Sequence, residues 1–226
     1  MWCKLGFLVF LSLNNYLIFA QNKYLPNHSY GKVDYLTFYI NEHNDTLFKE
    51  YVTLDFTDQI WPADSQQNIL LYYYDTTLVF PPRDSIILLY CPESYHIYWF
   101  SRDGESGYIN NKDEFFMHPM RDAQYYLLQL APFPYIIFND TDSVWQFNVR
   151  PPDMYCQYSI PCYTSYRLID KHYQYKNKEC YYVKAETRQE RGVSTMDLFY
   201  NKNQGPLYIS YHLFNGVTIN IYRVKE

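Results

Sequence analysis

Several features that identify common protein classes are missing from this sequence of 226 residues. It has no run rich in lysine or arginine and a formal net charge of −5, which argues against nucleic acid or an anionic membrane surface as a partner. No P-loop, dinucleotide fingerprint, G-x-S-x-G or H-E-x-x-H motif occurs. No cysteine pair has C-x₂-C spacing, which argues against a zinc site. The sequence therefore predicts a non-catalytic protein with no cofactor and no metal.

A long apolar run lies at the N-terminus, from Leu5 to Ala20, behind a single lysine. It is interrupted by Asn14-Asn15, so it is a poor fit to a membrane span of about 20 residues and predicts a signal peptide over residues 1–20. Cys3 precedes the run, so no lipid anchor is expected. We expect an exported protein, periplasmic or extracellular and not lipidated, with no membrane span after cleavage. Residues 21–226 are predicted to form a single β-rich domain, with a division near residue 150 as the alternative.

Four cysteines follow the predicted signal peptide, and an even number in an exported protein suggests disulfides. Cys156 and Cys162 flank a short proline-containing segment, so a local bridge between them is the first choice. Cys91 and Cys180 form the second candidate pair. Free buried thiols are the alternative.

The fold class follows from β-prone runs separated by turn residues, with no stretch of convincing helical periodicity. From residue 164 onward, five such runs are separated by four turn signals: Asn177-Lys178, Arg191-Gly192, Asn203-Gln204-Gly205 and Asn215-Gly216. The last of them is a strong hairpin signal. We predict a mainly β protein (α+β with short helices as the variant), built as a curved antiparallel sheet or half-barrel with a C-terminal meander. The polar segment from Ser101 to Gly107 is expected to be a solvated turn.

Tyrosine is unusually abundant, at 28 residues. Its ring packs on a pleated surface while its hydroxyl stays in contact with water, so most of these residues are expected to cover a sheet. The alternative is an exposed aromatic platform for a glycan or a protein. The candidates for such a platform are Trp61, Trp99, Trp145 and the run Tyr72–Tyr74.

The last hairpin suggests a second kind of binding surface. A two-residue Asn215-Gly216 loop would pair His212 with Ile219 and would leave neither face of the hairpin cleanly polar. A sheet exposed on one side alternates more sharply, which favours a curved sheet with an apolar or lipid-like ligand on its concave face. The expected lining residues are Phe199, Ile209, Tyr211 and Ile219.

The stretch around His118 and Arg121 is the most motif-like segment, because a histidine, an arginine and acidic residues lie close together. No second histidine stands at ligand spacing, so a structural loop is the preferred interpretation. A hydrolase using His118 is the least favoured function.

Two segments resemble exported Bacteroidetes proteins of unknown function. EFFMHPMR followed by QYYLLQLAPFP resembles an HPPR…PFP pattern, although Met120 replaces a proline, and ECYYVKAETRQERGVSTMDLFYNKNQGPLYISYHLFNGVTINI resembles their C-terminal end. Such endings are similar to the lipoprotein-carrier (LolA/LolB-like) fold, a curved antiparallel half-barrel. The resemblance implies export and this topology, with a lipid or other apolar ligand, or an envelope protein, as the partner. It carries no catalytic or ligand-binding residue across to this chain.

Overall fold

The computed structural model describes residues 30–60, 67–74, 103–118, 131–138, 143–149, 162–189 and 192–224. Within these ranges the chain is β structure with turns and contains no helix. The strands are β1 (Gly31–Ile40), β2 (Thr46–Ile60), β3 (Gln67–Tyr74), β4 (Asp103–Asn110), β5 (Glu114–Met117), β6 (Tyr135–Ile137), β7 (Val144–Val149), β8 (Cys162–Tyr175), β9 (Lys178–Gln189), β10 (Gly192–Asn201), β11 (Gly205–His212) and β12 (Thr218–Arg223).

All of these strands belong to one antiparallel sheet with the order β6-β5-β4-β3-β2-β1-β12-β11-β10-β9-β8-β7. Each half of the chain forms a meander, and the two meanders join where β1 pairs with β12, for example Thr37 with Ile221. The first and last strands therefore lie at the centre of the sheet, and the sequence neighbours β6 and β7 lie at its two opposite edges.

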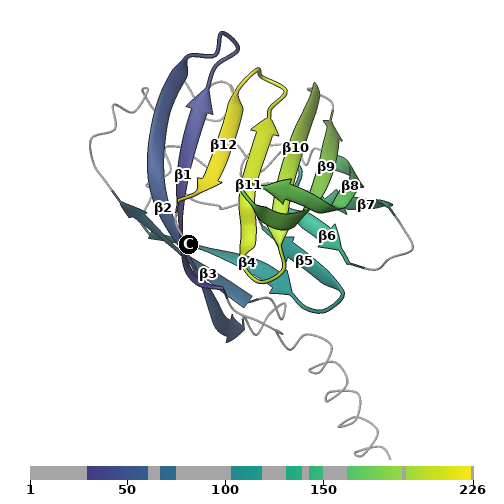
Figure 1. Cartoon of the computed structure of the whole chain (residues 1–226). Helices are drawn as coiled ribbons and strands as arrows, with labels where there is room; N and C mark the ends of the chain where they lie inside the picture. The colour runs from purple at the N-terminus through teal and green to yellow at the C-terminus, as the bar shows by residue number, and fades with distance from the viewer. Residues whose placement is uncertain are drawn as a thin grey trace, which may run out of the picture.

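The sheet curves so strongly that β4, β5 and β6 lie across from β7 to β10 (Figure 1). The two edges meet through side chains. The Tyr135 ring on β6 lies 5.5 Å from the Phe147 ring and 6.3 Å from the Trp145 ring, both on β7. No ladder of backbone hydrogen bonds joins β6 to β7 among the described residues, so the sheet is curved but is not a closed barrel.

Strict alternation assigns each strand two different faces, because successive side chains of a strand point to opposite sides. On β10 the buried residues are Ser194, Met196, Leu198 and Tyr200, and the residues between them are partly or fully exposed. The buried set belongs to the core on the concave face, which we call the inner face. The other set lies on what we call the outer face.

The core on the inner face is rich in tyrosine, and some of the buried hydroxyls find partners inside the protein. The Tyr35 hydroxyl donates to the Pro206 carbonyl oxygen at 2.9 Å, and the Tyr200 hydroxyl donates to Asn110 Oδ1 at 3.2 Å. Such pairing removes most of the cost of burying a hydroxyl. Six tyrosines are buried with less than 2% exposure: Tyr35, Tyr39, Tyr108, Tyr166, Tyr200 and Tyr211.

The predicted fold class is confirmed, since the described chain is an antiparallel sheet that curves without closing. The predicted turn at Ser101–Gly107 is wrong from residue 103 onward, because Asp103 to Asn110 form β4 and pair with β3. Polar and glycine-rich composition suggested a turn, but pairing on both sides holds this segment extended. Within the described residues, no helix has the length and apolar character needed to cross a membrane.

Candidate functional site

The four residues predicted to line a ligand-binding concavity do not share one face of the sheet. Ile209, Tyr211 and Ile219 lie together on the inner face and are 2%, 1% and 0% exposed. Phe199 lies on the outer face, between the inner-facing Leu198 and Tyr200. Phe199 therefore does not line the concave face, and a ligand touching the other three would have to displace side chains of the core. The apolar ligand on the concave face stays a prediction.

The register of the last hairpin explains this outcome. Leu213 N–H donates to the Val217 carbonyl oxygen, so the loop contains three residues, Phe214 to Gly216, and Gly216 adopts a φ of +83°. The predicted two-residue loop is wrong, and the true register pairs Tyr211, not His212, with Ile219. A shift of one residue exchanges the faces of a strand. The inner face of the hairpin is consequently apolar, and its outer face mixes aromatic and polar side chains.

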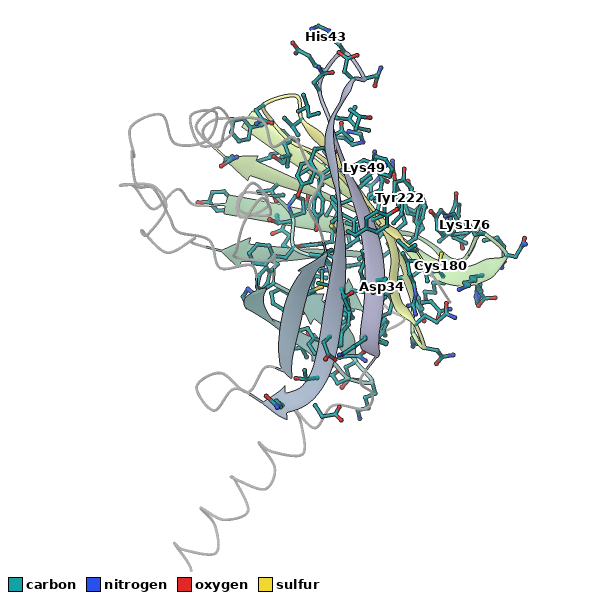
Figure 2. All side chains as sticks on the ribbon, turned by 90° about the vertical axis from the view of Figure 1, so that its left-hand side faces the viewer. Asp34, His43, Lys49, Lys176, Cys180 and Tyr222 are labelled. Carbon is teal, nitrogen blue, oxygen red and sulfur yellow. The ribbon has the colours of Figure 1, made fainter. Side chains whose placement is uncertain are left out.

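A line of aromatic rings crosses the outer face. Tyr182 on β9 is paired with Phe199 on β10, which is paired with Tyr208 on β11, which is paired with Tyr222 on β12. These four residues, called the ring row below, are half-buried. The same register line continues through Leu36 on β1 to Tyr51 on β2, whose side chain is 46% exposed. Figure 2 shows Tyr222 on one side of the sheet together with Lys49 and Lys176.

Neighbouring rings of the row are in direct contact. The centroid distances are 4.9 Å between Tyr182 and Phe199, 5.3 Å between Phe199 and Tyr208, and 4.9 Å between Tyr208 and Tyr222. Cross-strand aromatic pairs of this kind stabilise a sheet by about 0.2–1 kcal/mol each. The row is therefore a preformed surface.

The tip of the β8–β9 hairpin folds over part of this row. Two irregularities in β8, between Leu168 and Asp170 and between Asp170 and Tyr173, break the register with β9. Bulges of this type bend a strand. Beyond them, the Tyr175 ring stacks 5.7 Å from the Tyr208 ring, and Lys176 Nζ lies 5.7 Å from the centroid of Tyr222. The turn itself uses Lys176 and Asn177, both at positive φ, one residue before the predicted Asn177-Lys178.

A line of polar side chains runs beside the ring row, two residues away along each strand. Lys184, Asp197, Ser210 and Asn220 are paired in succession across β9 to β12, and we call these four residues the polar row. The two rows are joined by hydrogen bonds. Tyr182 donates its hydroxyl to Asp197 Oδ1 at 2.6 Å, and Tyr208 donates to Asn220 Oδ1 at 2.9 Å.

The ionisation state of the two rows follows from this arrangement. Burial raises the pKa of Tyr222 to about 12, and burial together with the hydrogen bond to Asp197 raises the pKa of Tyr182. The pKa of Lys184 is raised by its hydrogen bond with Tyr182 and by the Asp197 carboxylate, 3.4 Å from Nζ. At neutral pH the outer face therefore presents uncharged phenol rings beside a charged lysine. The Tyr173 and Tyr175 rings each lie 4.9 Å from the Phe199 ring, so the row offers a ligand the ring surfaces that these two tyrosines leave uncovered, together with polar groups for hydrogen bonding.

The backbone and the ring of His118 both make contacts within the fold. The His118 N–H donates to the Gly107 carbonyl oxygen at 2.9 Å, and its ring packs 4.9 Å from Phe116 and 5.6 Å from Phe133. Arg121 lies outside the described residues. Among the described residues no group of three or more histidine, cysteine or acidic side chains is arranged to hold a metal ion.

The predicted Cys91–Cys180 bridge is not present, because Cys180 is a free, buried thiol at 2% exposure. Its Sγ donates to the Tyr173 carbonyl oxygen at 3.4 Å, and burial raises its pKa to about 11. Cys91 and Cys156 lie outside the described residues, so the Cys156–Cys162 bridge stays a prediction.

Of the aromatic residues predicted to form an exposed platform, Trp145 is buried at 8% exposure and stacks on Tyr166. Trp61 and Trp99 lie outside the described residues, and for Tyr72–Tyr74 only the backbone, in β3, is described. The ring row was missed, although the sequence carries a signal for it. Each contributing strand has an aromatic and a polar residue two positions apart: Lys49 and Tyr51, Tyr182 and Lys184, Asp197 and Phe199, Tyr208 and Ser210, Asn220 and Tyr222.

Neither a protein-family model nor a curated protein matches the sequence. Three solved structures are similar over most of their length. A protein from Parabacteroides distasonis provisionally named a lipoprotein has 10% identity and a TM-score of 0.42, covering 88% of this chain and 95% of its own. A provisionally named exported protein with a YmcC-like fold from Bacteroides fragilis has 9% identity and a TM-score of 0.37, covering 90% and 99%.

The third is a domain from Vibrio parahaemolyticus provisionally named an outer membrane lipoprotein-sorting protein. It has 9% identity and a TM-score of 0.33, covering 92% of this chain and 89% of its own. These are the kinds of protein that the sequence resemblance named. The likenesses are too distant to assign a ligand or a function to this chain.

Proposed function

We propose that this protein is an exported, non-catalytic binding protein that contacts a glycan through the outer face of its sheet. The observation that carries the proposal is the ring row, in which four aromatic side chains follow one register line across β9 to β12. A contiguous aromatic surface that is not fully buried is a common mark of a binding site.

The chemistry of the outer face fits a polysaccharide. Sugar rings have apolar faces that stack on aromatic rings, and hydroxyls around their edge that need donors and acceptors. The ring row supplies the aromatic rings for stacking, and the polar row supplies the donors and acceptors for the sugar hydroxyls. Because both rows cross the strands, successive binding positions are about 4.8 Å apart, close to the length of one sugar unit in an extended chain.

The proposal is tested by affinity electrophoresis in gels containing neutral or acidic polysaccharides, with variants on and off the row. Tyr51→Ala removes the most exposed ring of the register line, at 46% exposure, and Tyr163→Ala removes a more exposed ring elsewhere on the outer face, at 61% exposure. We expect about tenfold weaker binding for Tyr51→Ala, equivalent to about 1.4 kcal/mol, and no change for Tyr163→Ala.

Equal behaviour of the two variants would contradict the proposal, and so would the absence of retardation in every polysaccharide. Binding of the same face to a purified envelope protein, with no binding to any glycan, would replace the glycan by a protein partner.

A further inference from the structure

Among the described residues, three exposed cations on the outer face, Lys49, Arg167 and Lys176, have no carboxylate of the protein within ion-pair distance. We propose that the glycan bound there is anionic and carries carboxylate groups, and that Lys49 and Lys176 are the residues that recognise them. This inference rests on the proposed function and adds the charge of the ligand.

The carboxylates on the outer face are already engaged within the protein. Asp197 accepts from Tyr182 and Lys184, Asp34 Oδ1 accepts from Thr53 Oγ1 at 2.5 Å, and Glu186 accepts from Arg188 Nε at 2.6 Å. Each of them therefore has a donor or a cation of its own.

Three cations on the same face are different. Lys49 is paired in register with Phe38, Arg167 is paired with Lys184, and Lys176 forms the turn of the β8–β9 hairpin. Within the described part of the chain none of these three has a carboxylate within ion-pair distance. This excess of positive charge is local, because the whole chain has a net charge of −5.

Lys176 places its ammonium group next to two aromatic rings. Its Nζ lies 5.3 Å from the centroid of Tyr175 and 5.7 Å from that of Tyr222, so the cation lies close to the rings. Lys49 lies on the other side of Tyr222 in Figure 2 and follows the polar row toward β2. Both lysines therefore lie at the Tyr222 end of the ring row, one on each side of the Tyr222 ring.

The choice of a carboxylate-bearing glycan over a simple polyanion follows from the Tyr222 ring, which lies between the two lysines. A polyanion without sugar rings would gain only the exposed charges, which contribute little in water. A uronic acid polymer would use the charges and the rings together.

Three soluble polymers separate the contribution of the carboxylates from that of the sugar rings. Each is titrated against the full chain by isothermal calorimetry. They are polygalacturonate, its fully methyl-esterified form, and polyglutamate. We expect the methyl ester to bind about tenfold more weakly than the acid, and polyglutamate more weakly still. Raising the ionic strength from low to about 0.15 M should weaken binding of the acid and leave the ester unchanged.

Two variants complete the experiment. Lys176→Gln and Lys49→Gln should each weaken binding of polygalacturonate about threefold and leave the ester unchanged. Lys112→Gln, an exposed lysine in the turn between β4 and β5, is the matched control and should change neither.

Equal affinities for the acid and its ester would overturn this inference and leave the proposed function intact. Polyglutamate binding as tightly as polygalacturonate would also overturn it. If no glycan binds, the proposed function and this inference fall together.

Discussion

The inner and outer faces of the sheet use the same residue type, tyrosine, in two different ways. On the inner face the tyrosines fill the core, and Tyr35 and Tyr211 are 1% exposed. On the outer face Tyr208 and Tyr222 are half-buried, and their rings form a continuous line with Tyr182 and Phe199. The first set contributes stability, and the second set presents a surface.

The difference lies in what the hydroxyls meet. The Tyr35 hydroxyl reaches a backbone carbonyl inside the fold, whereas the Tyr182 and Tyr208 hydroxyls reach polar side chains at the outer surface. A tyrosine-rich composition thus supports both a core and a binding surface. Successive side chains of a strand point to opposite faces, so the position of a tyrosine along its strand decides which role it takes.

The largest expected effect comes from alkaline pH, which acts on the inner tyrosines. Burial raises the pKa of Tyr35, Tyr166 and Tyr211 well above the unfolded value of about 10. Their contribution to stability is therefore fully present below pH 10 and is lost as pH rises above it, because only the unfolded state ionises. The loss should be about 1.4 kcal/mol per tyrosine and pH unit, or about 4 kcal/mol for the three together.

Urea unfolding between about pH 8 and pH 11, followed by circular dichroism, measures this loss. The phenolate absorbance of these tyrosines should appear together with unfolding. Its appearance in a protein that keeps its native circular dichroism would contradict the burial of these residues.

Two adjacent residues of β10 compare the faces directly. Leu198 is 0% exposed on the inner face, and Phe199 lies half-buried in the ring row. Leu198→Ala should lower the free energy of unfolding by about 2–5 kcal/mol, because it opens a cavity in the core. Phe199→Ala should cost about half as much and should weaken glycan binding about tenfold. Chemical denaturation measures the loss of stability, and affinity electrophoresis measures the loss of binding. An equal loss of binding in the two variants, measured on folded protein, would contradict the distinction between the faces.

A smaller effect is expected where the two outer rows are joined. Asn220 Oδ1 accepts from the Tyr208 hydroxyl at 2.9 Å and from Ser210 Oγ at 2.8 Å. Asn220→Ala leaves both partly buried hydroxyls without their acceptor and should lower the free energy of unfolding by about 1 kcal/mol. Urea denaturation of this variant beside Asn203→Ala, at an exposed turn position, is the test. Equal stability of the two variants would show that water replaces the asparagine fully.

The smallest stability effects are expected at the exposed tyrosines. Tyr51→Ala and Tyr163→Ala should each change the free energy of unfolding by less than about 0.5 kcal/mol, as is usual for surface substitutions. Thermal unfolding of both variants checks this. A loss above about 1 kcal/mol for Tyr51→Ala alone would mean that Tyr51 supports the sheet more than it presents a surface.

Much of the fold could be predicted from the sequence, because alternation and turn residues are local signals. The Asn215-Gly216 signal, for example, does mark the connection between two strands, β11 and β12. The register could not be predicted, since it depends on whether the loop holds two residues or three. That single residue decides whether Ile219 lies beside Tyr211, and whether the outer face carries aromatic and polar rows.

The candidate site was missed for the same reason. Phe199 was predicted to line the concave face, whereas alternation along β10 places it on the outer face. Its neighbours in the row come from β9, β11 and β12, and only the strand pairing brings Tyr182, Tyr208 and Tyr222 beside it. Strand pairing between distant segments is not encoded in local propensity.

The proposed binding surface is the outer ring row together with Tyr51. Hydroxyl-radical footprinting of the native protein, with and without saturating polygalacturonate, tests it most directly by reporting the exposure of each tyrosine. We expect protection of Tyr51 and Tyr222, and unchanged labelling of Tyr163. A saturated complex in which Tyr51 and Tyr222 are labelled as in the free protein would contradict it.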